Sequence, residues 1–407
     1  MKTYIFLFLL IPIFSYSKVL IGIESLISDQ FHLIENKNIG IITNHTSVIP
    51  SGKHFVDHLF EMKKVNIVAL FGPEHGIRGD IPDGSIINNS IDALTGITIY
   101  SLYGDIRKPT KDMLKGIDVL IFDIQDVGAR FYTYISTLNN CIEAAAENNI
   151  KFIVCDRPNP IGGVKVAGPI LKPNVKSFVG IQPIPVQHGM TVGELAMMFN
   201  DEGWFENNVK ADLTVIKVRN WSRSQLFDQT GMNWINPSPN MVSSEAALIY
   251  PGLCLIEGTN VSEGRGTLKP FLTIGAPYID SDRLIKELQQ TDLKGVKFNS
   301  ISFTPVAIKN MNANPKYKDK PCKGLQIQVT DPQEVEAVKL GITIIYLINS
   351  LHKSEFKFDT TRFNRLMGDD SIIDKILAGK TPEDILGSWE SELTNFIKIR
   401  EKYLFYN

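Results

Sequence analysis

The feature that most constrains the fold is a series of short apolar, β-branched segments that alternate with amphipathic stretches from residue 38 onward. Such alternation is typical of βαβ units, in which helices join parallel strands. The expected strands are residues 39–43, 66–71, 98–100, 119–122, 152–155 and 213–218, and the expected helices are 53–62, 110–115, 132–148 and 191–199. The last helix is expected to begin with a capping box formed by Thr191 and Glu194. The strands at 119–122 and 152–155 are almost wholly apolar, so both faces of the sheet should be covered. We therefore expect an α/β fold with a parallel sheet.

The sequence changes character after residue 240. The segment 250–277 contains eight glycines or prolines, which is typical of long loops. Further elements are expected as helices at 282–289 and 335–352 and strands at 296–303 and 325–329. A length of 407 residues also favours two domains. We expect a larger α/β domain over residues 18–245 and a smaller α+β domain over residues 246–407.

The first 17 residues have the pattern of a secretory signal peptide. A short basic start is followed by an apolar run at residues 4–14, and Ser15 and Ser17 supply the small side chains of a cleavage site. A buried helix or a membrane anchor is the alternative, but the run is shorter than the roughly 20 residues that span a bilayer. We expect a periplasmic or extracellular protein with no stable membrane insertion after cleavage.

The composition and the missing motifs exclude several classes of protein. The 42 basic and 44 acidic residues nearly cancel, so no overall charge favours nucleic acid as a partner. The sequence contains no G-x-G-x-x-G motif and no P-loop, which argues against nucleotide cofactors, and it also lacks G-x-S-x-G and H-E-x-x-H. Nucleotide cofactors are therefore not expected.

Neither a metal site nor a disulfide framework is expected. His75 and His188 could bind a metal together with nearby aspartates, but their spacing is not that of a tight local site. The four cysteines are widely spaced, which suggests small buried side chains, although one disulfide after export is left open.

Polar residues follow four of the predicted strands at the point where each strand ends. Asn44 follows the first strand, Glu74 and His75 the second, Asp123 comes after residues 119–122, and Asp156 after residues 152–155. Ligands of open α/β sheets bind outside the carboxyl ends of the strands. These loops should therefore converge on one pocket.

Three carboxylates are the candidates for catalysis: Glu74, Asp123 and Asp126. Glu74 lies in a glycine-bounded turn at an apolar strand end, where desolvation would favour the protonated form that a general acid needs. It could instead cap a helix or pair with Arg78. One of the two aspartates could be a second catalytic group and the other a partner of Arg130.

Long motifs in this chain resemble the exo-β-N-acetylmuramidase family, once catalogued as a domain of unknown function. The matching segments are FGPEHGIRG (71–79), SLYG (101–104), DIQDVGARFYTYISTL (123–138), DRPNPIGG (156–163), HGMTVGELA (188–196), PSPNM (237–241), YPGLCLIEGTNVSEGRGT (250–267) and REKYLFY (400–406). The resemblance implies a Rossmann-like N-terminal domain, a smaller C-terminal domain and a cleft between them. It also implies an exported glycoside hydrolase that removes N-acetylmuramic acid from the non-reducing end of peptidoglycan fragments and needs no cofactor.

The resemblance makes Glu74 the first candidate for the catalytic acid. The substrate carries a lactyl carboxylate, so an arginine should bind it, and Arg130, Arg157 and Arg265 are the candidates. The complete set of predicted substrate-binding residues is Asn44, His75, Arg78, Arg130, Tyr132, Asp156, Arg157, Asn159, His188, Asn240, Glu257, Asn260, Glu263 and Arg265. A non-catalytic protein that binds muropeptides is the alternative function, and a metal-dependent hydrolase is the third.

Overall fold

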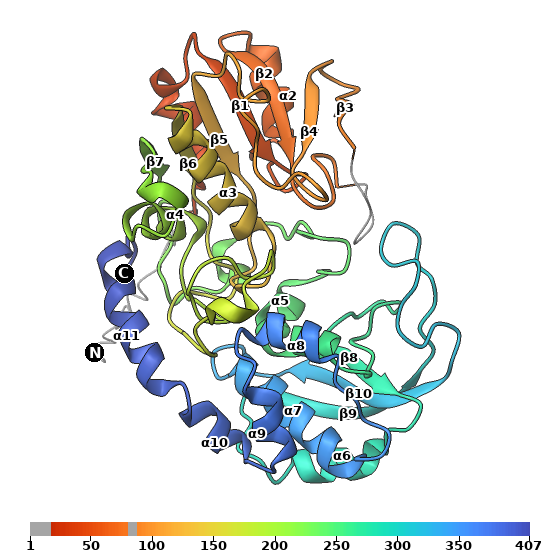
Figure 1. The fold of residues 1–407 in the computed structure, drawn as a ribbon. Coiled ribbons are helices and arrows are strands. Elements are labelled where there is room, and N and C mark those ends of the chain that lie inside the picture. The colour runs from red at the N-terminus through yellow and green to blue at the C-terminus, as the bar shows by residue number, and fades with distance from the viewer. Residues whose placement is uncertain (1–17, 80–87) are drawn as a thin grey trace, which may run out of the picture.

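The computed structural model describes residues 18–79 and 88–407, and within them the chain forms two parts that each contain a sheet (Figure 1). The signal peptide predicted at residues 1–17 lies outside the described residues. No helix among the described residues is long and apolar enough to cross a membrane.

The N-terminal part is built on a seven-stranded sheet with the order β3-β4-β2-β1-β5-β6-β7. All neighbouring strands in it pair in parallel except β3 and β4. The strands are β1 (Asn38–Thr43), β2 (Asn66–Gly72), β3 (Ser90–Ile91), β4 (Thr98–Ser101), β5 (Val119–Asp123), β6 (Lys151–Cys155) and β7 (Leu213–Ile216). The predicted parallel sheet is thus confirmed, and the two-residue edge strand β3 was not predicted.

Helices cover both faces of this sheet, as the continuous hydrophobicity of β5 and β6 predicts. The helices are α1 (Gly22–Ser28), α2 (Phe55–Met62), α3 (Tyr134–Glu147) and α4 (Val192–Asp201). Phe122 and Val154 share one core with α3 and α4, while Ile121 and Ile153 share a second core with α1 and α2. The predicted capping box of α4 is present, with Thr191 and Glu194 exchanging hydrogen bonds.

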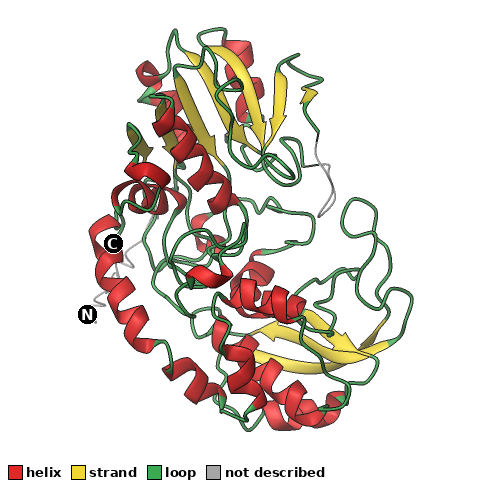
Figure 2. Ribbon diagram, in the orientation of Figure 1, coloured by secondary structure: helices red, strands yellow, loops and turns green. Residues whose placement is uncertain are grey.

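The C-terminal part is smaller and contains a three-stranded antiparallel sheet in the order β8-β10-β9 (Figure 2). Its elements are α5 (Ser244–Leu253), β8 (Thr273–Ala276), α6 (Ser281–Leu288), β9 (Val296–Phe303), β10 (Cys322–Val329), α7 (Ala337–Leu351), α8 (Thr360–Met367), α9 (Ile372–Leu377), α10 (Pro382–Gly387) and α11 (Glu390–Arg400). Helices α5 and α7 cross at Gly252 and Gly341, where a Cβ on Gly252 would come within 1.7 Å of the Ala337 carbonyl oxygen. Only glycine permits this approach.

Some elements differ from the sequence predictions. Residues 111–116 form turns rather than the expected helix at 110–115. The domain boundary between residues 245 and 246 stays a prediction, and these two residues lie in the first turn of α5. Helix α5 was not predicted, because eight of its ten residues are buried and it therefore lacks a polar face to reveal its period.

All four cysteines are buried and free.

The end of the chain returns to the N-terminal part (Figure 1). The hydroxyl of Tyr406 donates to Asp156 at 2.5 Å and accepts from the Val218 amide at 2.9 Å. The Phe405 amide donates to Glu194 at 2.8 Å. The last residues thus attach to the carboxyl ends of β6 and β7 and to the start of α4.

We expect Tyr406→Phe to lower the free energy of unfolding by about 1–3 kcal/mol, because it removes a hydrogen bond to a buried carboxyl group. Urea denaturation followed by circular dichroism would measure the change. Tyr346→Phe is the matched control, since the Tyr346 hydroxyl has no hydrogen-bond partner in residues 18–79 and 88–407. Equal midpoints for both variants would contradict a stabilising role for the Tyr406 contact.

Candidate active site

A cavity of about 670 Å³ lies between the two parts of the chain. The N-terminal part contributes the loop after β2 and the start of α3, and the C-terminal part contributes α5, the loops that follow it and α8. This is the edge of the parallel sheet at which ligands of α/β proteins bind. The predicted cleft between the two parts is therefore present. Of the polar residues predicted at the four strand ends, however, only Glu74 and His75 line it.

Glu74 enters the cavity from the turn that ends β2. The turn is tight, because His75 and Gly76 both have left-handed backbone angles, with φ of +73° and +72°. A histidine in this region of φ is strained, and such strain concentrates at functional sites. The carboxyl group of Glu74 is half-buried and accepts a hydrogen bond from the Thr133 hydroxyl at 3.0 Å. One of its oxygen atoms is thus held in place while the side chain faces the cavity.

Aromatic rings line the middle of the cavity. Tyr250 makes edge-to-face contacts with Phe131, Tyr132 and Phe271, with ring centroids 5.3, 5.8 and 4.8 Å apart. Burial raises the pKa of Tyr132, and the charges of Asp126 and Glu74 raise it further. The Tyr132 hydroxyl therefore stays neutral at the pH of a living cell. Rings of this kind offer an apolar surface on which a sugar can pack.

Charged side chains form the opposite wall. Glu257 is buried and pairs with both Arg265 and Arg362. Burial alone would raise its pKa, but Arg265, Arg362 and Lys316 outweigh this effect and lower the pKa of Glu257 to about 2. Glu257 is therefore an ionised anchor for two guanidinium groups, which argues against it as a proton donor.

Helix α8 carries Arg362 and Arg365 one turn apart, and both line the cavity. The helix is held by Arg130, which donates to the carbonyl oxygen of Leu366 at 2.9 Å. A Cβ on Gly368, which ends the helix with φ of +77°, would lie 2.2 Å from the Arg130 guanidinium, so glycine is required there.

Arg130, which was predicted as a substrate ligand, does not line the cavity. It is almost fully buried, and it donates to the carbonyl oxygens of Pro169 and Ile184 as well as to that of Leu366. The expected partnership with Asp123 or Asp126 is absent among the described residues. Its guanidinium donates hydrogen bonds to main-chain carbonyls of both parts and so holds the two parts together.

Five of the predicted site residues line the cavity together. They are Glu74, His75, Tyr132, Glu257 and Arg265. Glu263, also predicted, lies close behind Arg265 and forms ion pairs with Lys316 at 3.2 Å and with Arg265 at 3.6 Å. The remaining predicted residues do not line this cavity.

Asp123 and Arg157, predicted as a catalyst and a substrate ligand, pair with each other and do not line this cavity. Asp123 is fully buried, and Arg157 donates to its two oxygen atoms at 2.7 and 2.8 Å. The Ser47 hydroxyl donates to the same carboxylate. Buried charges need such partners, so the pairing indicates a role in stability.

Asp126 and His188 also lie outside the cavity lining. Both are buried, and 3.9 Å separates His188 Nε2 from Asp126 Oδ2. Burial raises the pKa of Asp126 to about 7, and it lowers the pKa of His188 to about 3 with help from Arg400 and Arg130. His188 is therefore neutral, and the geometry brings neither group to the cavity.

Arg78 and Asn44 have structural partners as well. Arg78 pairs with Asp57 and Asp92 rather than with Glu74, the partner considered from the sequence. Asn44 accepts hydrogen bonds from the amide and the hydroxyl of Thr46 and so closes a turn after β1.

The other predicted ligands fix loops and helix ends. Asp156 accepts from Thr191, Gly193 and Tyr406 at the start of α4. Asn159 donates to Met190, Asn240 donates to Met311, and Asn260 bonds Tyr278 and two main-chain groups. These contacts are internal, so the structure does not bring the three asparagines or Asp156 into the cavity.

Several cavity residues were not predicted from the sequence. They are Thr133, Tyr250, Arg362 and Arg365, together with Asp359, which caps α8. Asp359 followed by two arginines at helical spacing is a local signal for α8, but its position opposite Glu74 depends on contacts between distant segments. The described residues contain no group of three metal-ligating side chains.

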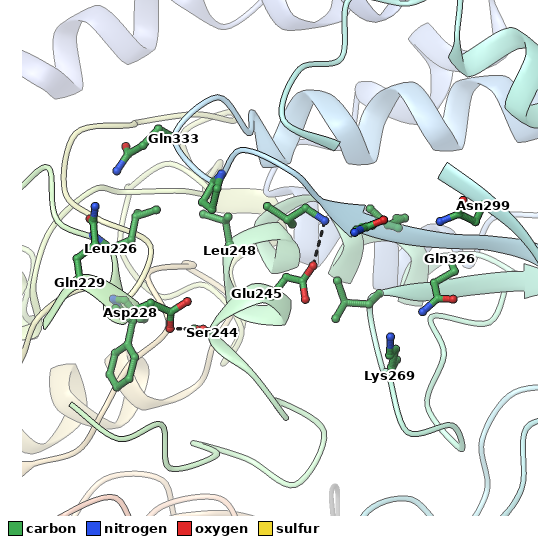
Figure 3. A pocket seen from close by; sticks show the side chains of 17 residues that line it. Leu226, Asp228, Gln229, Ser244, Glu245, Leu248, Lys269, Asn299, Gln326 and Gln333 are labelled. Carbon is green, nitrogen blue, oxygen red and sulfur yellow. Dashed lines mark hydrogen bonds between the residues drawn. The ribbon is translucent and has the colours of Figure 1, made fainter. Parts of the chain in front are cut away.

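A second groove, of about 750 Å³, lies on the other side of α5 (Figure 3). Ser244 and Leu248 face this groove, whereas Tyr250 points to the opposite side of the helix and lines the first cavity. The two carboxylates of this second groove accept hydrogen bonds from the protein itself. Ser244 donates to Asp228 at 2.7 Å, and the Val329 amide donates to Glu245 at 3.0 Å. No predicted site residue lines it, so the cavity that holds Glu74 is the candidate active site.

Comparisons with known proteins agree with the sequence motifs. Two family models match, described as "Exo-beta-N-acetylmuramidase NamZ, N-terminal" over residues 39–245 and "Exo-beta-N-acetylmuramidase NamZ, C-terminal" over residues 248–406. The chain is 48% identical over 390 residues to the peptidoglycan beta-N-acetylmuramidase NamZ of Bacillus subtilis strain 168, covering 96% of this chain and 92% of that protein.

Two crystal structures of DUF1343 family proteins from Bacteroides fragilis NCTC 9343 have the same fold. One gives a TM-score of 0.88 at 34% identity and the other a TM-score of 0.78 at 37% identity. Each comparison covers 96% of this chain and 99% of the solved chain.

We expect Arg157→Leu to lower the free energy of unfolding by about 3–5 kcal/mol, because it leaves the Asp123 carboxylate buried without its partner. Arg219→Leu, which breaks an exposed pair with Asp29, should destabilise the protein much less, because solvent screens exposed ion pairs. Urea titrations of the two variants measure both changes in unfolding free energy. Equal losses of unfolding free energy in the two variants would show that burial does not determine how much an ion pair stabilises this protein.

The stability contributed by Glu257 should depend on pH. Its folded-state pKa of about 2 lies below its ordinary value of 4.5, so its contribution is complete above pH 4.5 and is lost as the pH falls toward 2. The difference in unfolding free energy between the wild type and Glu257→Gln should therefore shrink from pH 5 to pH 3, measured by urea denaturation. A difference that stays constant over this range would contradict the conclusion that ionised Glu257 stabilises the fold.

Proposed function

Because the chain belongs to the exo-β-N-acetylmuramidase NamZ family, we propose that it is a glycoside hydrolase that releases N-acetylmuramic acid from the non-reducing end of peptidoglycan fragments. The observation that carries the proposal is the half-buried Glu74 carboxyl in a cavity with aromatic rings and guanidinium groups. The proposed substrates are muropeptides and disaccharides that contain N-acetylmuramic acid, and no cofactor is required.

Glu74 is the proposed general acid. The Thr133 hydroxyl holds Oε2, which leaves Oε1 to carry the proton toward the glycosidic oxygen. As the bond between the anomeric carbon and that oxygen breaks, the proton goes to the leaving sugar, and water supplies the hydroxyl group that ends on the anomeric carbon. Tyr132 and Tyr250 present the apolar surface against which the sugar ring packs.

We further propose that the protein acts outside the cytoplasm in cell-wall turnover. The support is the pattern of residues 1–17, with its basic start, apolar run and small residues before Lys18. Fractionation of expressing cells, with mass spectrometry of the mature N-terminus, tests this. A chain that begins at Lys18 outside the cytoplasm is the expected result.

Glu74→Gln should reduce hydrolysis of a muramic acid disaccharide by about 10²- to 10⁴-fold, because a sugar leaving group needs protonation. Hydrolysis of a p-nitrophenyl β-muramide should fall less, since its leaving group is stable as an anion. Glu61→Gln, at an exposed position on α2, is the control. Circular dichroism confirms that each variant is folded.

Near-normal turnover of the disaccharide by folded Glu74→Gln would remove Glu74 from the mechanism. Release from the muramide but not from the corresponding N-acetylglucosaminide, with and without EDTA, is expected of the wild type. Binding of muropeptides without any turnover would favour the non-catalytic alternative, and loss of activity in EDTA that a divalent ion restores would favour a metal-dependent hydrolase.

A further inference from the structure

We propose that Arg365 binds the lactyl carboxylate of N-acetylmuramic acid and thereby selects this sugar over N-acetylglucosamine. This inference rests on the proposed function and names the residue that sets its specificity. N-acetylmuramic acid differs from N-acetylglucosamine by one lactyl ether, whose carboxylate is the only added charge. A site that distinguishes the two sugars therefore needs a cation with free hydrogen-bonding capacity.

Three of the four cations near the cavity are already occupied. Arg265 and Arg362 both pair with Glu257. Lys316 donates to the carbonyl oxygens of residues 256, 257 and 261 at 3.0–3.1 Å and also pairs with Glu263. A ligand carboxylate would have to compete with these buried partners, and breaking such pairs is costly.

Arg365 has no competing anion. It is exposed, it lines the same cavity as Glu74, and no carboxylate lies within ion-pair distance of it among the residues that the structure describes. The wall as a whole has a surplus of positive charge, since Glu257, Glu263 and the helix cap Asp359 face four cations. A single bound carboxylate would neutralise this surplus.

The neighbouring arginine on α8 adds to the effect. Arg362 and Arg365 are three positions apart, so their like charges repel across one turn of the helix. Half of the Arg362 side chain is exposed. A carboxylate bound at Arg365 would reduce the repulsion between the two guanidinium groups.

The helix that carries Arg365 is fixed before a ligand arrives. Asp359 accepts from the Arg362 amide at 3.1 Å at one end of α8, and Arg130 holds the Leu366 carbonyl at the other. A fixed backbone reduces the entropy that must be lost when the guanidinium orders around a carboxylate. The position of Arg365 in the cavity is thus set by the fold.

The test compares Arg365→Gln and Arg365→Lys with p-nitrophenyl β-muramide and with its lactyl methyl ester, which has the same shape and no charge. For Arg365→Gln we expect KM for the muramide to rise about 10- to 100-fold with kcat little changed, and KM for the ester to stay within about twofold. Arg365→Lys should restore part of the loss, because lysine keeps the charge but not the bidentate geometry. Arg283→Gln on the exposed surface of α6 is the charge-matched control.

Equal losses on both substrates, or no loss on the muramide, would overturn the proposal. It would also fail if Arg362→Gln alone gave the charge-specific loss. Calorimetric binding of free N-acetylmuramic acid to Glu74→Gln, with and without Arg365→Gln, separates this inference from the proposed function. Binding that depends on Arg365 without wild-type turnover would contradict only the hydrolase, whereas turnover that does not depend on Arg365 would contradict only the specificity residue.

Discussion

The active-site cavity depends on one short segment, residues 130–134, that holds both of its walls. Arg130 binds the main-chain carbonyl at the end of α8, and Thr133, three residues later, donates to Glu74. Tyr132 lies between them and contacts Tyr250 from the C-terminal part. The distance between the proposed acid and the cationic helix is therefore set by a buried guanidinium and two side chains on one continuous stretch of backbone.

Much of the fold could be predicted because its signals are local. Apolar runs such as 119–122 identify strands, and Thr191 with Glu194 identifies the start of α4. Helix α5 gave no such signal, since a helix buried on nearly all sides has no amphipathic pattern. The turns at 111–116 show that a short segment with helical composition does not form a helix unless packing supports it.

The site was harder to predict, for reasons of charge. Polar residues at the ends of four strands were expected to meet in one pocket, but of these residues only Glu74 and His75 line the cavity. Asp123 and Asp156 also lie at strand ends, but their carboxylates accept hydrogen bonds from other residues of the protein. A buried carboxylate needs such partners. Which carboxyl stays open is decided by contacts with distant residues such as Arg157 and Tyr406. Arg365 was missed for the same reason, since only the tertiary fold places α8 opposite β2.

The return of the chain to its starting domain has a consequence for how the molecule comes apart. The polypeptide passes from the N-terminal part to the C-terminal part near α5 and comes back through α11 to Asp156 and Glu194. The C-terminal part is thus connected to the N-terminal part at both of its ends, once through the backbone near α5 and once through the contacts of the C-terminal tail. Unfolding of the C-terminal part must break the contacts that Phe405 and Tyr406 make beside β7. The two parts should therefore unfold together, as one cooperative unit.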